Sequence, residues 1–304
     1  MYPTEDDIRR QLDPARLISA LETAFRDRFP TITLPPRTYI ETAQGFFLFM
    51  SCYDRSGSAL GMKFVAVHNA PAHTGDRIQA TYILFDPATA IPRLIIPANY
   101  LTDLRTAAAS ALATKFLAPD DARVLGIFGT GRQARAHLKV LPHVRRFQRV
   151  LICGRDFDRS RAFAKAEAAS INLPIEPVDA RTCATQSDVI CACTNSATPL
   201  FNGNWLRPGT HLNLVGAFQP HTREVDSLTI ARTRVVVDTY EGAMSEAGDL
   251  LIPLAEGAIS RSHVLADLHT LVTGEPLRQD NTGITLFKSV GCALEDLVAA
   301  ELLL

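Results

Sequence analysis

The hydrophobic residues of the chain change their spacing near residue 119. Between Thr38 and Asn99, short apolar runs are separated by Gly, Pro, Asp and Ser, which is typical of consecutive strands. Short connections between such strands favour an antiparallel or mixed sheet. The predicted strands are TYIET, GFFLFMSCY, ALGMKFVAV, IQATYILFD and PRLIIPAN.

After residue 119 the apolar runs alternate with stretches of helical character. Continuous Val, Ile and Leu runs of this length are typical of parallel strands buried on both faces. The pattern therefore predicts a series of βαβ units. The runs are VLGIF (124–128), VLIC (150–153), DVICAC (188–193), HLNLVGAF (211–218) and RVVVD (234–238).

Three helices outside this series are predicted from caps and apolar stripes. Asp13 caps a helix that has Pro14 in its first turn and buries one stripe, made of Leu17, Leu21, Ala24 and Phe25. Thr102 is a candidate N-cap for the small-residue helix LTDLRTAAASALATKFL. A further helix is predicted near Ser262–Val272.

These elements predict an α/β protein with two domains. A Rossmann-type, doubly wound parallel sheet occupies residues 119–282, and an α+β domain begins with residues 1–118. The stretch TGEPLRQDNTG is rich in Gly and Pro and precedes ITLFKSVG and a last helix. We expect residues 283–304 to return to the first domain, which makes that domain discontinuous.

Composition and charge exclude several classes of partner. Apolar residues make up 47% of the chain, charged residues 21%, and the formal net charge is −1. This balance gives no reason to expect nucleic acid or an anionic membrane as a partner. The opening MYPTEDDIRR is too polar for a secretory signal, and no apolar run approaches the ~18–20 residues of a membrane span.

Six cysteines are scattered along the chain. Cys191 and Cys193 alternate within DVICAC, which places both on one face of a predicted buried strand. A metal pair is the alternative, but no second Cys/His pair at ligand spacing accompanies them. We therefore expect no metal site, and a reduced, cytoplasmic protein.

The segment GTGRQA at residues 129–134 has the G-x-G-x-x-A pattern of dinucleotide-binding turns. The predicted strand VLGIF runs directly into Gly129, and a helical stripe begins at Ala134. Gly129 would make the tight turn, Gly131 would let the backbone approach the pyrophosphate, and Ala134 would permit close packing. The amides at the helix start, in Arg132 and Gln133, would bind the phosphate charge.

The end of the second strand indicates the cofactor. An acid there would bind the ribose 2′-hydroxyl of NAD, but the sequence is VLICGRD, with Gly154 and Arg155 at that position. Arg155 suits a 2′-phosphate, so NADP(H) is favoured. Asp156 and Asp158 keep NAD(H) as the alternative, and Arg155 is then an ordinary surface arginine.

Three cations stand in unusual contexts. Arg105 falls in the first turn of its predicted helix, where a cation opposes the helix dipole. Exposed amides, Thr106 and the guanidinium would together bind a carboxylate, and the alternative is pairing with a neighbour such as Asp103. Lys63 lies within a predicted strand, either at a sheet edge or lining a cavity. Arg37, after two prolines, is by itself most simply a solvated residue.

Several segments together resemble the ornithine cyclodeaminase/mu-crystallin family. They are GMKFV, LTDLRTAAASALATKFLA, FGTGRQA, VGAF followed by REVD, and LFKSVGCALEDL, in the order of that family. The resemblance covers nearly the whole chain. It implies a homodimer whose first domain forms the interface and the substrate pocket, and a second domain that binds NAD(P).

The resemblance also implies roles for individual residues. Lys63 and Arg105 match carboxylate ligands near the nicotinamide, with Arg37 as a third. Further positions match family contacts to cofactor or substrate: Thr81, Gly131, Arg132, Thr194, the segment LNLV at 212–215 with Val215, Ser289 and Val290. Thr106, beside Arg105, and Gln133, in the glycine motif, are further candidate cofactor residues.

One position departs from the cyclodeaminases. They carry an aspartate shortly after the Val-Gly of the fifth strand as proton donor and acceptor, whereas VGAFQPHTREVD has Phe218 there. Phenylalanine transfers no protons, and ornithine conversion to proline requires proton transfer as ammonia leaves. Asp226 lies further along, and His221 would substitute only if the loop were rearranged. Phe218 would instead be an apolar wall of the substrate pocket.

The departure favours a ketimine reductase. Members without this aspartate resemble enzymes that reduce Δ1-pyrroline-2-carboxylate or Δ1-piperideine-2-carboxylate to the L-amino acid, and the sequence does not distinguish these two substrates. The alternatives are ornithine cyclodeaminase, an amino-acid dehydrogenase such as alanine dehydrogenase, and a non-catalytic, crystallin-like NADPH or ligand carrier.

Overall fold

The computed structural model describes the chain except residues 1–2, 58, 70–76 and 279. Contacts divide it into two units: unit 1 is Met1–Arg105 with Cys292–Leu304, and unit 2 is Thr106–Gly291. These limits differ from the predicted boundaries at 118/119 and 282/283. The chain is an α/β protein that holds one antiparallel and one parallel sheet.

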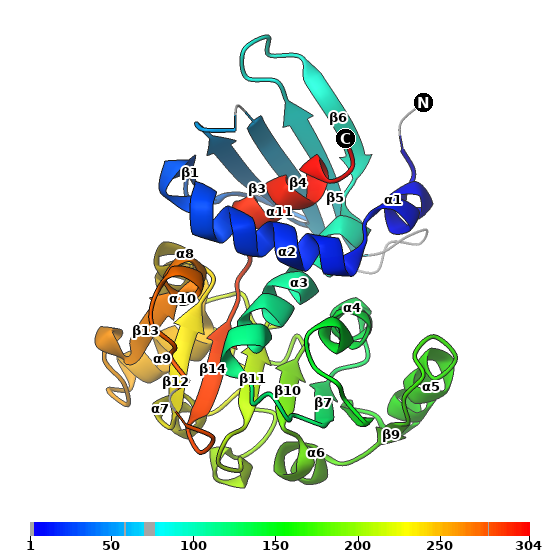
Figure 1. Cartoon of the computed structure of the whole chain (residues 1–304), viewed down its shortest axis with the longest axis vertical. Coiled ribbons are helices and arrows are strands. Elements are labelled where there is room, and N and C mark those ends of the chain that lie inside the picture. Colours follow the sequence, from blue (N-terminus) through cyan, green and yellow to red (C-terminus); the bar gives the residue numbers. More distant parts are fainter. Residues whose placement is uncertain (1–2, 58, 70–76, 279) are drawn as a thin grey trace. The chain divides into compact units, whose positions relative to one another are not determined.

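Unit 1 contains an antiparallel sheet covered on one face by helices (Figure 1). The strand order is β1-β3-β4-β5-β6, and β2 also pairs with β3. The predicted strands from Thr38 onward are confirmed. The strands are β1 (Ile32–Thr33), β2 (Thr38–Thr42), β3 (Gly45–Asp54), β4 (Ala59–His68), β5 (Ile78–Phe85) and β6 (Pro92–Pro97).

The helices α2 and α11 lie across this sheet (Figure 1). As predicted, the side chain of Asp13 accepts a hydrogen bond at the start of α2, Pro14 stands in its first turn, and the predicted apolar stripe is buried. The helical segments of unit 1 are α1 (Glu5–Gln11), α2 (Pro14–Thr23), a π-helix (Ala24–Arg28), a 3-10 turn (Phe29–Thr31) and α11 (Ala293–Glu301).

Helix α3 (Asn99–Leu117) is divided between the units at Arg105. It begins at Asn99, so Thr102 lies inside the helix and is not its N-cap. Its C-terminal carbonyls, which lack partners within the helix, accept hydrogen bonds from two arginines of unit 2. Arg145 donates to Lys115 and Ala118, and Arg278 donates to Leu117.

Unit 2 is built on a parallel sheet of eight strands with the order β13-β12-β14-β11-β10-β7-β8-β9. The predicted βαβ series is confirmed, because each of its five apolar runs forms a buried strand. The strands are β7 (Val124–Phe128), β8 (Arg149–Cys153), β9 (Ile175–Pro177), β10 (Val189–Ala192), β11 (His211–Leu214), β12 (Thr233–Val237), β13 (Val264–Asp267) and β14 (Ile284–Lys288).

Two sequence predictions were wrong in this unit. Strand β14 pairs with β11 and β12 inside the parallel sheet, so residues 283–291 do not return to the first domain. The helix predicted near Ser262–Val272 is a 3-10 turn (Arg261–His263), strand β13 and the short helix α10 (Leu268–Thr273). In the second segment, a buried strand of four residues has the same apolar pattern as a helical stretch.

The helices of unit 2 connect successive strands along the chain and lie beside the parallel sheet (Figure 1). Among the helices of the described residues, none combines the length and apolar character that crossing a membrane requires. The helical segments are α4 (Arg132–Val140), α5 (Phe157–Glu167), α6 (Ala180–Gln186), α7 (Ser227–Ala231), α8 (Tyr240–Glu246), α9 (Gly248–Ala255), and 3-10 turns at Leu141–His143 and Gly203–Trp205.

Candidate functional site

Lys63 is buried on the helix-covered face of the antiparallel sheet. Strand β4 is central, and Lys63 pairs in register with Met50 on β3 and Tyr82 on β5. Its side chain is 1% exposed, so it is not at a sheet edge. The Nζ atom lies 2.8 Å from each carboxylate oxygen of Asp296 on α11.

Arg105 binds the same carboxylate. Its Nε donates to Oδ1 of Asp296 at 2.9 Å, and its Nη1 donates to Oε2 of Glu295 at 2.6 Å. Because α3 begins at Asn99, Arg105 lies in the second helical turn, so its predicted place in the first turn was wrong. The binding of a carboxylate by Arg105 stays a prediction. Its acidic partners include Glu295 and Asp296 of α11, which are distant in the sequence.

The charges of this cluster oppose one another. Burial lowers the pKa of Lys63 to about 8, and repulsion from Arg105 and Arg37 adds to the effect, while Asp296 works against it. Burial would also lower the pKa of Arg105, but Asp296 and Glu295 outweigh it and raise this pKa above its ordinary range. Arg37 therefore lies close enough for its charge to act on Lys63. Unit 1 brings the three predicted cations into one electrostatic cluster.

Glu295 and Asp296 were not recognised in the sequence as part of this cluster. Both are 0% exposed in α11. A buried carboxylate needs a cation or several hydrogen bonds. Two adjacent acids in the apolar stretch ALEDLVAA were therefore a signal that this helix faces buried cations.

Thr81 lies on the other face of the same sheet. It pairs with Phe64, whereas its neighbour Tyr82 pairs with Lys63. Because side chains alternate between faces along a strand, Thr81 points away from the side of Lys63. Its cofactor role stays a prediction.

The glycine motif follows strand β7 and begins helix α4, as predicted. Gly129 has a φ of 111°, and a Cβ there would lie 2.6 Å from the carbonyl oxygen of Cys193. Gly131 is the N-cap of α4 and makes no side-chain capping bond, and a Cβ on it would meet no atom within 4 Å. The open space in front of this helix N-terminus fits a pyrophosphate. Ala134 is buried behind the turn.

The order of strands places this motif at a switch point. The chain passes from β7 to β8 and β9 on one side, then crosses to β10 and β11 on the other. Ligands of such sheets bind at the carboxyl ends of the strands where the order reverses. Thr194 follows β10 and Val215 follows β11, so these two predicted cofactor residues lie at that end.

The end of β8 holds the residues predicted to distinguish NADP from NAD. Gly154 follows the strand and Arg155 is exposed. Asp156 is the N-cap of α5, where its carboxylate accepts the amide of Arg159 at 3.0 Å. This acid already serves as a helix cap.

The loop after β11 holds the position that departs from the cyclodeaminases. Phe218 is partly buried and packs against the hydrophobic core of unit 2. His221 is exposed. Asp226 caps α7 and also accepts the amide of Gly203 at 2.9 Å, so both of its oxygens serve local structure.

The segment after β14 is fixed by one acid. Oδ2 of Asp238 accepts the Ser289 hydroxyl at 3.1 Å and the amides of Val290 and Gly291 at 2.8 and 2.6 Å. Ser289 and Val290 are 1% and 8% exposed. Asp238 was not recognised in the sequence.

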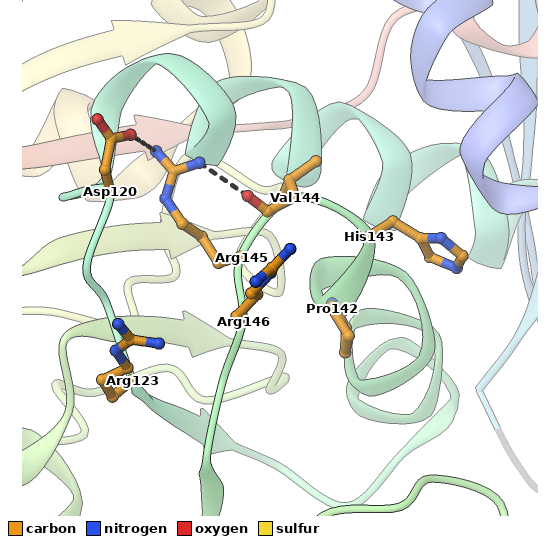
Figure 2. Close-up of a pocket in the computed structure, with 7 residues that line it drawn as sticks. All are labelled: Asp120, Arg123, Pro142, His143, Val144, Arg145 and Arg146. Atoms are coloured by element: carbon orange, nitrogen blue, oxygen red, sulfur yellow. Dashed lines mark hydrogen bonds and ion pairs between the residues drawn. The ribbon is translucent and has the colours of Figure 1, made fainter.

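A cavity of about 440 Å³ lies at the opposite, amino end of β7 and β8 (Figure 2). Its basic character comes mainly from exposed arginines, since the guanidinium of Arg145 is engaged with backbone carbonyls. The lining residues are Asp120, Arg123, Pro142, His143, Val144, Arg145 and Arg146.

The cysteines show no metal arrangement. Cys191 and Cys193 are buried, and all six cysteines are free. Within the described part of the chain, no group of three or more His, Cys, Asp and Glu is placed to hold a metal ion.

Comparison with protein families agrees with this geometry. The model of the ornithine cyclodeaminase/mu-crystallin family matches residues 1–304. The chain belongs to this family. The buried cations of unit 1 and the glycine turn of unit 2 lie in segments that carried the resemblance.

Relatives within the family include named reductases. Ketimine reductase mu-crystallin of Macropus fuliginosus is 35% identical over 308 residues, covering 98% of this chain and 94% of the relative. A Delta(1)-pyrroline-2-carboxylate reductase of Bacillus cereus is 35% identical over 264 residues, covering 86% and 81%.

Solved structures of the family have the same fold over the whole chain. The Thermococcus litoralis Delta(1)-pyrroline-2-carboxylate reductase, in complex with NADH and L-proline, has a TM-score of 0.93 at 34% identity and covers 100% of this chain and 96% of its own. An archaeal alanine dehydrogenase dimer with bound NAD has a TM-score of 0.92 at 26% identity, with 100% and 94% covered.

Proposed function

We propose that this oxidoreductase uses NAD(P)H to reduce a small cyclic ketimine carboxylate, Δ1-pyrroline-2-carboxylate or Δ1-piperideine-2-carboxylate, to the L-amino acid. The observation that carries the proposal is that two buried cations, Lys63 and Arg105, bind the same carboxylate of Asp296. The positive charge of Arg37 also acts on Lys63. Named reductases among the relatives, with comparable length, support the same class of substrate.

The three cations of unit 1 would bind the substrate carboxylate. Arg105 offers a planar guanidinium suited to a carboxylate, and its orientation is fixed by Glu295 and Asp296. Lys63 and Arg37 add positive charge beside it. Two fixed cations and one carboxylate define how the ring is held, which is the positioning that such a reaction requires.

Reduction of the C=N bond adds a hydride to C2 and a proton to the ring nitrogen. The nicotinamide, when bound to unit 2, supplies the hydride. Lys63 would supply or share the proton, since a pKa of about 8 lets its ammonium give up a proton near neutral pH. The product is the cyclic L-amino acid, in which the ring nitrogen is a secondary amine bonded to C2.

The loop after β11 supports a reductase in preference to a cyclodeaminase. Phe218 has no proton to transfer, and its packing against the core is that of an apolar wall. Asp226 caps a helix and His221 is exposed. These placements support the proposal that neither residue replaces the aspartate that ornithine deamination needs.

NADP(H) is the proposed cofactor, with NAD(H) as the alternative. Gly154 and Arg155 follow β8, where an acid would bind the ribose of NAD, and Asp156 is engaged as a helix cap. A guanidinium at this place suits a 2′-phosphate. The neighbouring structures carry NADH or NAD, so the preference must be measured.

A homodimer is also proposed. The face of the antiparallel sheet opposite Lys63 is apolar, and Met62 and Phe64 on β4 are 39% and 37% exposed. Phe47 and Phe49 of β3 contact Phe64 at ring distances of 5.4 and 4.8 Å. An exposed aromatic face of this kind is typical of a protein interface. We propose that a second copy of this chain covers it, because the structurally similar archaeal alanine dehydrogenase is a dimer.

One spectrophotometric screen tests the proposal. The purified protein is mixed with NADPH or NADH and with pyrroline-2-carboxylate, piperideine-2-carboxylate, pyruvate with an amine, or ornithine, and absorbance is followed at 340 nm. We expect stoichiometric NADPH oxidation with a cyclic ketimine. Ammonia release from ornithine with a catalytic amount of cofactor would identify a cyclodeaminase. Cofactor oxidation only in the mixture of pyruvate with an amine would identify an amino-acid dehydrogenase. Binding without turnover would identify a carrier.

A further inference from the structure

Glu224 links the ends of two neighbouring strands of the parallel sheet. Its Oε1 accepts the amide and the hydroxyl of Thr194, both at 2.7 Å. Its Oε2 accepts the amides of Gly216 and Ala217 at 2.7 and 3.3 Å. Thr194 follows β10 and Gly216 follows β11, so one carboxylate holds the carboxyl ends of both strands.

The ends of β10 and β11 are packed so closely that the backbone at Thr194 and Gly216 has little room to move. A Cβ on Gly216 would lie 1.8 Å from the carbonyl oxygen of Thr194. A Cβ on Gly129, in the glycine turn, would lie 3.4 Å from the Thr194 methyl group. A shift of Thr194 would therefore displace both Gly216 and the glycine turn at Gly129, on the two sides of the switch point.

Burial of the Glu224 carboxylate is energetically unfavourable. Glu224 and Asp249 are both 0% exposed, and burial and the nearby Asp249 raise the pKa of Glu224 while Lys288 opposes this. Asp249 in turn accepts the amide of Glu224 at 2.7 Å, and its other oxygen lies 2.9 Å from Nζ of Lys288. Lys288 also donates to the carbonyl of Ala217 at 2.6 Å.

Three backbone amides and the Thr194 hydroxyl point at the two oxygens of Glu224, an arrangement that favours the ionised carboxylate and opposes the effect of burial on its pKa. A buried anion with one buried counterion is rarely retained for stability alone, because apolar residues of similar size often stabilise as much. The four hydrogen bonds that the Glu224 carboxylate accepts come from the loops after β10 and β11, at the carboxyl end of the sheet, which is where a function for it would lie.

We propose that Glu224 is a positioning residue that sets the geometry of the Thr194 and Gly216 loops for the nicotinamide half of the cofactor. In doubly wound sheets one half of a dinucleotide lies over the first three strands and the other half over the next three. The glycine turn and Arg155 belong to the first group, and Thr194 and Gly216 to the second. The inference rests on the cofactor part of the proposed function and is independent of the substrate.

The test compares a whole dinucleotide with its adenine half. Glu224→Gln keeps the shape but places an NH2 group against two of the four donors. Dissociation constants are measured for NADPH by fluorescence and for adenosine 2′,5′-bisphosphate by calorimetry. We expect NADPH to bind about tenfold more weakly or worse, while the adenine-half ligand keeps its affinity. If the protein prefers NADH, the pair is NADH and ADP.

Asp226→Asn is the matched control, since this acid also binds three local donors but at Gly203 and α7. We expect it to lower the unfolding temperature and leave the ratio of the two dissociation constants unchanged. Should Glu224→Gln fail to fold, Thr194→Val removes one hydrogen bond of the link, and Thr194→Ser retains it. The valine variant is then expected to weaken NADPH alone, by about threefold or more.

An unchanged NADPH affinity in the variants overturns the inference, and so does equal weakening of both ligands, which indicates a purely structural role. Failure of the wild-type protein to bind either dinucleotide would instead refute the cofactor part of the proposed function. A wild-type protein that binds NADPH but reduces no ketimine leaves the comparison, and the inference, intact.

Discussion

Lys63 and Asp296 form a buried ion pair between strand β4 and helix α11, with Nζ 2.8 Å from both carboxylate oxygens. The same carboxylate binds Arg105. Asp296 therefore balances two of the three cations that we propose bind the substrate, and it fixes the distance between them.

Removal of this carboxylate should destabilise the fold and impair catalysis. Asp296→Asn leaves Lys63 and Arg105 buried with only Glu295 as a counterion. We expect the free energy of unfolding in urea to fall by about 3–5 kcal/mol, the usual cost of breaking a buried pair, and kcat/KM for the ketimine to fall with it. Asp6→Asn, at an exposed pair with Arg9, is the control and should change neither. Wild-type stability of Asp296→Asn would show that the pair is unimportant.

The pH profile of ketimine reduction should report Lys63. Its ammonium is the form that binds a carboxylate and supplies a proton, and its pKa is lowered to about 8. We expect kcat/KM to decline as pH rises through about 8. Lys63→Arg should move this decline to higher pH, because arginine stays protonated. A decline at the same pH in the arginine variant would assign it to another group.

Unfolding does not explain that decline, as the sign of the linkage shows. The folded pKa of Lys63, about 8, lies below the value near 10.5 of the unfolded chain. The unfolded state thus binds more protons between these values, and the contribution of Lys63 to stability rises with pH across this window. Activity and stability should therefore move in opposite directions from pH 8 upward if Lys63 dominates both.

Acid should destabilise unit 2 through two buried histidines. Burial lowers the pKa of His137 to about 4 and that of His211 to about 3. Both pKa values lie below the 6.5 of an unfolded histidine. The stability that the two neutral histidines contribute is therefore fully present above pH 6.5 and is lost as pH falls toward 4. We expect the urea midpoint to drop across this range. His137→Gln should flatten the drop, whereas exposed His221→Gln should leave it unchanged.

Arg155 should determine the choice between the two nicotinamide cofactors. Arg155→Ala is expected to weaken NADPH binding by roughly tenfold to a hundredfold, as loss of a charge-assisted contact does, and to spare NADH. Arg161→Ala is the control, since this exposed arginine of α5 pairs with Asp158. Equal losses for both cofactors would indicate disturbed folding and not recognition of the 2′-phosphate.

The sequence predicted the elements whose signals are local. Alternating or continuous apolar runs marked β2 to β8 and β10 to β12, with only the short β9 missed among these neighbours. Asp13 and Pro14 marked a helix start. The glycine motif was found because strand, turn and helix are adjacent in the chain, so that one short segment contains the whole signal.

What the sequence did not yield depends on contacts between distant residues. Glu295 and Asp296 meet Lys63 and Arg105 only after α11 packs on the sheet. Glu224 and Asp238 are ordinary acids until the strand ends they bind are brought together. Strand β14 was placed in the wrong domain because its neighbours β11 and β12 precede it by dozens of residues and no local pattern specifies that pairing.

The central claim, that buried cations of unit 1 bind the substrate carboxylate, is tested most directly by two imines that differ in that group alone. The measurement is kcat/KM for Δ1-pyrroline-2-carboxylate and for 1-pyrroline, which lacks the carboxylate, in the wild type and in Arg105→Ala. We predict that the variant loses about a hundredfold or more with the acid, as expected for about 3 kcal/mol from a charge-assisted contact. Its activity with 1-pyrroline should stay nearly unchanged. An equal loss with both imines, or no loss with the acid, would contradict the account.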